Sequence, residues 1–289
     1  MGKKEDEINE SADCPVENVI SKCKNCGTEL SGTYCHNCGQ HRNTEKLTIK
    51  SIFPNFMYGV TSIDRGIMYT IKMLYTNPGK MIREYIDGKR VIYAKPFSMM
   101  VILAGIYGIL FSFAIILKNN GLNLDLSVEP PKGDYTLLQN IAYTILMWTK
   151  KSIIFSSLLM IPVYALSSKI VFKKLGLKKF TYAEILFVFA FIACQQLIID
   201  IILLPFSIFL PSDSGLMNYI DTAKYLSYFM LAAWSFKGLL SIKWKKAITK
   251  SIGMYLLSFL LAIAVLMIIA VIAKLILMIT GGTGFTINL

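Results

Sequence analysis

The sequence predicts an all-α integral membrane protein with about five transmembrane helices, preceded by a small cysteine-bearing hairpin and juxtamembrane amphipathic helices. The chain is 54% hydrophobic and 17% charged, whereas soluble domains are about 25% charged. Residues 97–117 carry no charge and would measure about 31 Å as a helix, close to the thickness of a bilayer's hydrocarbon core. Basic residues beside apolar spans explain the net charge of +12, so no nucleic-acid partner is expected.

Residues 1–22 are predicted to be a disordered tail, because they hold few large apolar residues and show no periodicity. They lack the apolar core of a secretory signal peptide, which predicts that the amino terminus stays in the cytoplasm. Cys14 stands outside any paired spacing and is given no role.

Two CxxC pairs, separated by eight residues, are formed by Cys23, Cys26, Cys35 and Cys38. A glycine follows each pair and permits a tight turn that aims both sulfurs at one point. Residues 23–41 are therefore predicted to be a zinc-ribbon-like module. We expect a short hairpin that turns near Ser31 and Gly32 and is folded by a bound zinc ion.

Other interpretations of these cysteines are two disulfides or a redox-active CxxC. Both fit a cytoplasmic segment with two adjacent pairs less well. His36 and His41 could replace a ligand, but four thiolates already complete a tetrahedral shell. A closed shell leaves no position for water or substrate, so the expected role is structural.

Residues 46–96 are predicted to be a basic amphipathic juxtamembrane segment, with nine Lys or Arg against three Asp or Glu. One helix is expected to have Asp64 as its N-cap. A second is expected to begin at Pro78, after Asn77 as N-cap, and to stop at Gly88. Such helices either lie on the anionic cytoplasmic leaflet or pack on the membrane domain as a small subdomain, and the sequence leaves both open.

Three cations and an aromatic ring lead the chain into the first span: Lys89, Arg90, Tyr93 and Lys95. This composition is typical of an interfacial anchor at the lipid headgroups. The same four residues are the candidate site for a lipid headgroup or phosphate.

The order of motifs is itself distinctive. A CxxCG and a CxxCGQ are followed by the spaced residues Thr70, Leu74, Pro78 and Gly79, and then by REYIDGKRVIYAKPF ahead of several spans. This order resembles an uncharacterised bacterial membrane family, known mainly from Bacteroidota and of unknown function. The resemblance covers residues 23–117 by motif and the remainder by hydropathy. It implies a multi-span architecture in a bacterial inner membrane, but no activity, substrate or catalytic residue.

The transmembrane domain is predicted to cover residues 97–289. An apolar run at 135–172 is too long for one crossing, and Lys150 and Lys151 interrupt it. A surface helix is therefore expected at 136–149. The five spans are expected at about 97–117, 152–172, 182–210, 220–240 and 252–279.

Lysine and arginine are distributed unevenly between the two predicted sides of the membrane. The segments 1–96, 173–179 and 243–250 hold 22 of them, against 5 in 118–151 and 211–224. By the positive-inside rule the amino terminus is cytoplasmic, and after five crossings the carboxyl terminus is outside.

The third span contains a polar cluster of Gln195, Gln196 and Asp200. An ionisable group at membrane depth costs several kcal/mol unless it is paired or hydrated, so it is a functional candidate by default. Lys150 and Lys151 are its expected partners near the outer face. Two interpretations are open: a structural ion pair, or a proton- or cation-linked site lined by Asp200, Gln196 and Lys151.

No enzyme is expected. Both histidines lie in or beside the cysteine pairs, and neither a GxSxG elbow nor a Walker A loop is present. Cys194 lies in an apolar run and is expected to be a buried hydrophobe.

The leading hypothesis is a non-enzymatic inner-membrane protein whose cytoplasmic zinc ribbon and basic helices recruit or sense a protein or an anionic lipid of the cytoplasmic leaflet. The alternative is a small transporter, channel or lipid-translocating protein that uses the polar cluster of the third span. An enzyme that acts on a membrane lipid through Lys89 and Arg90 is a third interpretation.

Overall fold

The computed structural model describes residues 21–44, 46–50, 66–118, 153–210 and 215–279. Within these residues the chain is mostly helical, and three helices are long and apolar enough to cross a membrane, namely Pro96–Ala114, Tyr182–Phe206 and Trp244–Ile269. A shorter apolar helix covers Leu159–Val171. Residues 1–20 of the predicted tail and the predicted surface helix at 136–149 lie outside the described residues.

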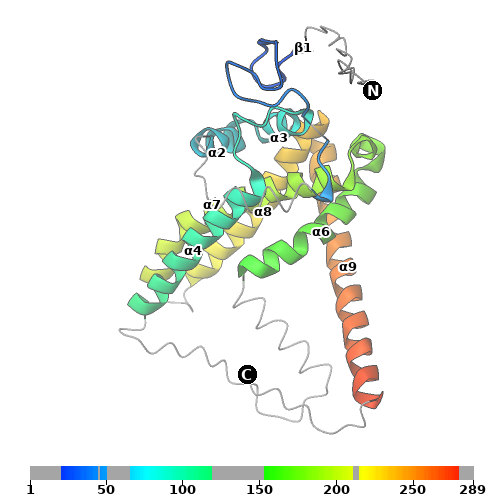
Figure 1. Cartoon of the computed structure of the whole chain (residues 1–289). Helices are drawn as coiled ribbons and strands as arrows, with labels where there is room; N and C mark the ends of the chain where they lie inside the picture. The colour runs from blue at the N-terminus through cyan, green and yellow to red at the C-terminus, as the bar shows by residue number, and fades with distance from the viewer. Residues whose placement is uncertain (1–20, 45, 51–65, 119–152, 211–214, 280–289) are drawn as a thin grey trace, which may run out of the picture.

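Two small hairpins form a cysteine module, residues 21–44, at one end of the molecule (Figure 1). Strand β1 (Ser21–Lys22) pairs antiparallel with β2 (Glu29–Leu30). An isolated antiparallel bridge joins Tyr34 to His41. Each hairpin has one CxxC pair in its turn.

The arrangement differs from the sequence prediction in two respects. Ser31 and Gly32 link the two hairpins instead of forming the turn of a single one, because each cysteine pair with its glycine already reverses the chain. The module also begins at Ser21, so the last two residues of the predicted tail 1–22 belong to a strand.

Helices α2 (Ile67–Thr76) and α3 (Pro78–Asp87) lie between the cysteine module and the remaining helices (Figure 1). As predicted, α3 has Pro78 at its first position, and Gly88 ends it in the left-handed region with φ of 116°. The N-cap of α2 is Gly66, and Asp64 lies outside the described residues.

Five longer helices form a bundle. They are α4 (Pro96–Lys118), α6 (Ile153–Val171), α7 (Tyr182–Phe209), α8 (Gly215–Leu240) and α9 (Trp244–Ile279). Two short 3₁₀ turns, η1 (Lys173–Leu175) and η2 (Leu177–Lys179), join α6 to α7. The fifth span was predicted to start at 252. The helix starts at Trp244, so most of the basic stretch 243–250 lies in its first turns.

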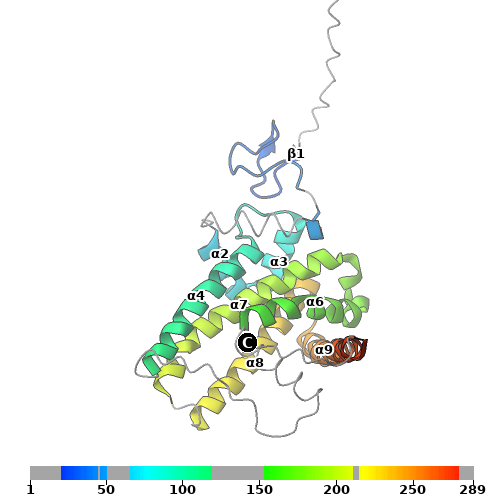
Figure 2. The ribbon, with the colours of Figure 1, turned by 60° about the horizontal axis from the view of Figure 1, so that its bottom comes forward.

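Helix α7 is the centre of the bundle and runs alongside α4 in both views (Figures 1 and 2). Residues 185–194 of this helix are all apolar, and Phe187, Val188 and Phe191 are fully buried. A helix that is apolar on all faces is expected to be enclosed by others. A capping box fixes its start, with the side chains of Thr181 and Glu184 bonded to each other's backbone N–H groups.

Several helix ends meet beneath the cysteine module. Phe172, after α6, stacks on Phe236 of α8 at 4.6 Å, and Arg83 of α3 donates to the carbonyl of Leu239. We call this the module end of the bundle. Helix α8 returns to it antiparallel to α7, because Tyr228 contacts Asp200 and Ser235 contacts Gln195 further along.

Helix α9 starts at the module end and then leaves the bundle (Figure 1). Its described buried residues all lie in its first half, at Ala247, Ser251, Met254 and Ser258. The described side chains beyond Ser258 are exposed or half-buried and mainly apolar. This surface needs a bilayer or another protein to cover it.

Candidate metal centre and intramembrane polar cluster

The two cysteine pairs have the same backbone geometry. In the first, the N–H of Gly27 donates to the carbonyl of Cys23, and the N–H of Cys23 donates to the carbonyl of Thr28, both at 2.8 Å. The second pair repeats both bonds at 2.8 Å, between Gly39 and Cys35 and between Cys35 and Gln40. Gly27 and Gly39 have φ of 79° and 75°, a region that favours glycine.

The four sulfurs lie within 4.8 Å of one another. Cys23 Sγ is 3.6 Å from Cys38 Sγ, and Cys26 Sγ is 3.5 Å from Cys35 Sγ. A tetrahedral zinc ion with Zn–S bonds of about 2.3 Å separates its sulfurs by about 3.8 Å. The four cysteines therefore fit a single metal ion, and they would fill its coordination shell.

The thiols differ in how easily they lose a proton. Hydrogen bonds with the hydroxyl and backbone of Thr28 lower the pKa of the exposed Cys26 to about 6. Burial raises the pKa of Cys38 to about 11. Metal ligation requires thiolates, so Cys26 is better prepared than Cys38 to bond a metal ion.

The two histidines stay outside this cluster. His36 is exposed, and the ring of His41 packs edge-on against Tyr34 with centroids 5.0 Å apart. The N–H of Asn43 donates to His41 Nδ1 at 3.1 Å. Neither ring is needed for a complete four-ligand site.

Gln40 joins the cysteine module to the helices and was missed by sequence reasoning. Its side chain is 4% exposed. Its Nε2 donates to the Gly88 carbonyl at 2.9 Å, and its Oε1 accepts from the Arg90 N–H at 3.1 Å. The only signal in the sequence was the glutamine that ends the CxxCGQ motif, and nothing local indicated a partner 48 residues away.

The residues proposed to bind lipid or phosphate lie beside this junction. Lys89 pairs with Glu84 at 3.0 Å, and the Tyr93 hydroxyl donates to the other oxygen of Glu84 at 2.6 Å. Arg90 lies 6.0 Å from the centre of the Tyr85 ring, and Lys95 is half-buried. The structure therefore brings Lys89 and Tyr93 together around the carboxylate of Glu84.

This carboxylate has a shifted pKa. Burial by itself raises the pKa of Glu84, but the hydrogen bonds from Tyr93 and Lys89 and the charge of Lys89 outweigh it and lower the pKa below its usual value. Burial, and then the hydrogen bond to Glu84, raise the pKa of Tyr93 well above its usual value.

Gln195 links α7 to α2 and α8. It is fully buried. Its Nε2 donates to the Leu74 carbonyl at 2.7 Å, and its Oε1 accepts from Ser235 at 3.3 Å. Its backbone carbonyl accepts from the Tyr75 hydroxyl at 2.6 Å. All of these contacts are internal, so Gln195 holds α2 on the bundle.

Asp200 makes a different set of contacts from Gln195. Its carboxylate accepts a hydrogen bond from Tyr228, and Lys224 Nζ lies 3.5 Å away. The sequence had assigned Lys150 and Lys151 as partners, but both lie outside the described residues. Lys224 and Tyr228 come from α8 and were not singled out, because their position beside Asp200 depends on the antiparallel return of that helix.

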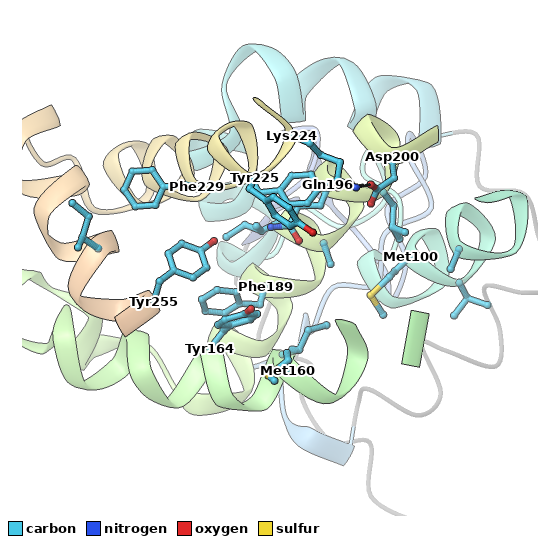
Figure 3. A pocket seen from close by; sticks show the side chains of 18 of the residues that line it. Met100, Met160, Tyr164, Phe189, Gln196, Asp200, Lys224, Tyr225, Phe229 and Tyr255 are labelled. Atoms are coloured by element: carbon cyan, nitrogen blue, oxygen red, sulfur yellow. Dashed lines mark hydrogen bonds and ion pairs between the residues drawn. The ribbon is translucent and has the colours of Figure 1, made fainter. Parts of the chain in front are cut away.

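Gln196 and Asp200 line a cavity among α4, α6, α7, α8 and α9 (Figure 3). Its volume is about 1040 Å³. Apolar and aromatic side chains form most of the wall, among them Met100, Met160, Tyr164, Phe189, Phe229 and Tyr255. We call it the bundle cavity.

The spaced motif residues 70, 74, 78 and 79 are buried. Thr70 Oγ1 accepts from the N–H of Ala94 at 2.8 Å. Gly79 lies so close to α8 that an added Cβ would come within 2.3 Å of Gly238 backbone atoms. These contacts are structural, and Cys194 is likewise fully buried, as expected.

Of the comparisons with known proteins, one found a match. No curated protein and no solved structure matches this chain. Residues 64–108, which include α2, α3 and the start of α4, match the family described as "Protein of unknown function (DUF3667)". This match and the four-cysteine cluster fit the uncharacterised family that the sequence motifs resemble.

Proposed function

We propose that this chain is a non-enzymatic, five-span protein of the bacterial inner membrane whose cytoplasmic zinc ribbon and basic residues recruit or sense a partner. The observation that carries the proposal is the Gln40 junction. Its two hydrogen bonds tie the cysteine module to the loop after α3. A rigidly docked module presents a fixed surface beside the membrane.

Zinc is the proposed ion because four soft thiolates in a closed shell suit a metal without redox chemistry. A cytoplasmic location supports this choice, since reducing conditions keep cysteines available as ligands.

The distribution of charge supports the proposed orientation. The lysines of η1 and η2, the start of α9 and the cysteine module all lie at the module end. Positive residues gather on the cytoplasmic side. Helix α8 has 26 residues against 28 in α7 and runs antiparallel beside it, which supports counting it among the five spans, and the apolar stretch Leu159–Val171 supports counting α6.

An anionic lipid is the partner that the geometry favours. A second cavity of about 430 Å³ opens at the module end and is lined by Arg83, Asp87, Leu175, Gly176, Lys179, Phe180 and Leu240. The neighbouring Lys178 is exposed. Basic pockets among helices on the cytoplasmic side suit phosphate headgroups, and this pocket is better placed for them than Lys89, which is already paired.

The test is native mass spectrometry of the intact chain released from the membrane into mild detergent under reducing conditions. We expect one zinc ion per chain in the wild type and in the control Cys14→Ser. We expect none when Cys23, Cys26, Cys35 and Cys38 are all changed to serine. Freshly prepared protein without metal would overturn the zinc ribbon.

The same spectra test the lipid partner. We expect anionic phospholipid to stay bound to the wild type and to the control Lys72→Gln, and to be reduced in the double variant Lys178→Gln and Lys179→Gln. Equal retention in all three would remove the anionic lipid from the proposal and leave a protein partner.

A further inference from the structure

The proposed zinc ribbon does not explain the bundle cavity. It is lined by side chains from five helices, and its volume of about 1040 Å³ is at the upper end of the range for ligand sites in proteins, about 300–1000 Å³. It is therefore large enough for a substantial ligand.

The wall of the cavity is divided chemically. Asp200, Gln196 and Lys224 lie together on one side, and Met160, Tyr164 and Phe189 lie across from them (Figure 3). A cavity with one polar side and a broad apolar wall matches an amphiphile, whose head group and hydrocarbon chain need different surroundings.

Two tyrosine hydroxyls in this wall can form further hydrogen bonds. Among the described residues, the hydroxyls of Tyr164 and Tyr255 make no hydrogen bond, and both side chains are half-buried in the cavity wall. Polar atoms of a ligand entering the cavity would give each hydroxyl a hydrogen-bond partner.

Lys224 also has donors to offer. Its Nζ lies 3.5 Å from Asp200 and 3.8 Å from Asp221, beyond the usual N–H···O distance of about 2.7–3.2 Å. An anionic group such as a phosphate would find hydrogen-bond donors at Lys224, while the carboxylates beside it would attract a cation.

The charges of the lining residues favour one class of lipid head group. Among the described residues that line the cavity, Asp200 and Lys224 are the charged ones, and their charges cancel. A head group with a net charge would leave an uncompensated charge in a poorly solvated site. A zwitterionic head satisfies both groups without that cost.

We propose that the bundle cavity binds one zwitterionic phospholipid. Its phosphate lies at Lys224, its ammonium lies at the Asp200 carboxylate, and its chains lie against the α6 and α9 side of the wall. This site is separate from the cysteine module and from the basic pocket at the module end, and it goes beyond the function proposed above.

The first experiment blocks the cavity. Gly105 of α4 lines it, and an added Cβ would meet nothing within 4 Å, so Gly105→Phe adds a bulky ring without a clash at the backbone. The matched control is Ile109→Phe, one turn along α4 at a residue that is 73% exposed. The intact proteins are reconstituted in bilayers of equal phosphatidylethanolamine and phosphatidylglycerol, extracted in mild detergent and weighed by native mass spectrometry.

The expected result is one bound phosphatidylethanolamine per wild-type chain and per Ile109→Phe chain, with occupancy at least about tenfold lower in Gly105→Phe. Equal retention of this lipid in Gly105→Phe, or no excess of it over phosphatidylglycerol at this site in the wild type, would overturn the proposal. Circular dichroism and thermal melting of each variant show that it is folded.

A second variant tests the head group. Lys224→Gln with Asp200→Asn removes both charges together, so neither is left buried without its partner. Losing a charge-assisted hydrogen bond lowers affinity by roughly ten- to a hundredfold, and we expect phosphatidylethanolamine to lose its advantage over phosphatidylglycerol. An unchanged preference for phosphatidylethanolamine over phosphatidylglycerol would show that Asp200 and Lys224 do not bind the head group.

Discussion

Gln40 makes two of the hydrogen bonds that attach the cysteine module to the helices, and Asn25 Oδ1 accepts another from the Ile92 N–H at 3.3 Å. We predict that Gln40→Ala loosens the module from the bundle but keeps its metal, because the sulfurs do not depend on this side chain. Removing a buried amide with two hydrogen bonds weakens the docked state by about 1–3 kcal/mol. Hydrogen exchange measures the result as faster exchange of the Arg90 amide, whose N–H donates to Gln40 Oε1.

Asn37→Ala is the control for this prediction. Asn37 belongs to the same module, and its side chain donates to Thr28 at an exposed position, so exchange at the junction should not change. Loss of zinc in Gln40→Ala would contradict a purely docking role.

Gly79 makes a second contact that depends on a single residue. We predict that Gly79→Ala destabilises the protein by about 1–3 kcal/mol or more, because the new Cβ would come within 2.2 Å of the Leu239 nitrogen. Thermal unfolding in detergent measures the loss. Gly253→Ala is the control, since its Cβ would meet only Val171 at 3.8 Å, and equal loss in both variants would contradict the explanation.

At this scale the sequence predicts local chemistry well. The four cysteines could be assigned from spacing because their geometry is built within two short turns. The roles of Gln40 and Gln195 could not be predicted, because each amide bonds to backbone atoms 48 and 121 residues away. Asp200 could be recognised as a polar residue in a span, but its partner Lys224 is brought to it by the fold.

At the scale of elements, the Glu84 carboxylate ties α3 to the loop that follows it. The folded protein lowers its pKa, so the ionised form is the one that stabilises the fold. By linkage, this contribution is present above the ordinary pKa of 4.5 and is lost as pH falls through the lower, folded value. Glu84→Gln should remove it.

Thermal unfolding of wild type and Glu84→Gln between pH 7 and pH 3 measures this contribution. We expect the wild type to be more stable at neutral pH and the difference between the two proteins to disappear in acid. Comparing the proteins at each pH cancels the release of metal that acid causes in both. A difference that stays constant with pH would contradict the linkage.

Element boundaries were predictable where the signal is local. Pro78 and Gly88 mark α3 because the proline ring and the left-handed glycine act within one turn. The start of α2 at Gly66 could not be predicted, because the reason for a glycine there is a contact with a distant part of the chain. An added Cβ at Gly66 would lie 2.7 Å from the Ile92 carbonyl oxygen. The first turns of α9 are basic, so hydropathy placed the span boundary inside the helix.

At the scale of the molecule, the five-span proposal predicts which connections face outward. We expect a membrane-impermeant maleimide to label Ser212→Cys in intact cells and to label Lys173→Cys only after the membrane is opened. The reason is that α7 carries the chain from the module end to the far end of the bundle. Labelling of Lys173→Cys in intact cells would reverse the orientation.

The contact between α3 and α8 also sets an order for assembly. Arg83 and Leu239 are 156 residues apart, a length that a ribosome needs on the order of ten to thirty seconds to synthesise at about 5–20 residues per second. Until α7 and then α8 have been made, the apolar residues of α3, such as Met81 and Ile82, lack the helices on which α3 packs in the finished protein, and the bilayer surface is the nearest apolar environment. We therefore expect the two placements that the sequence left open for this helix to be successive. The helix would rest on the membrane in the nascent chain and is buried against α8 in the finished protein.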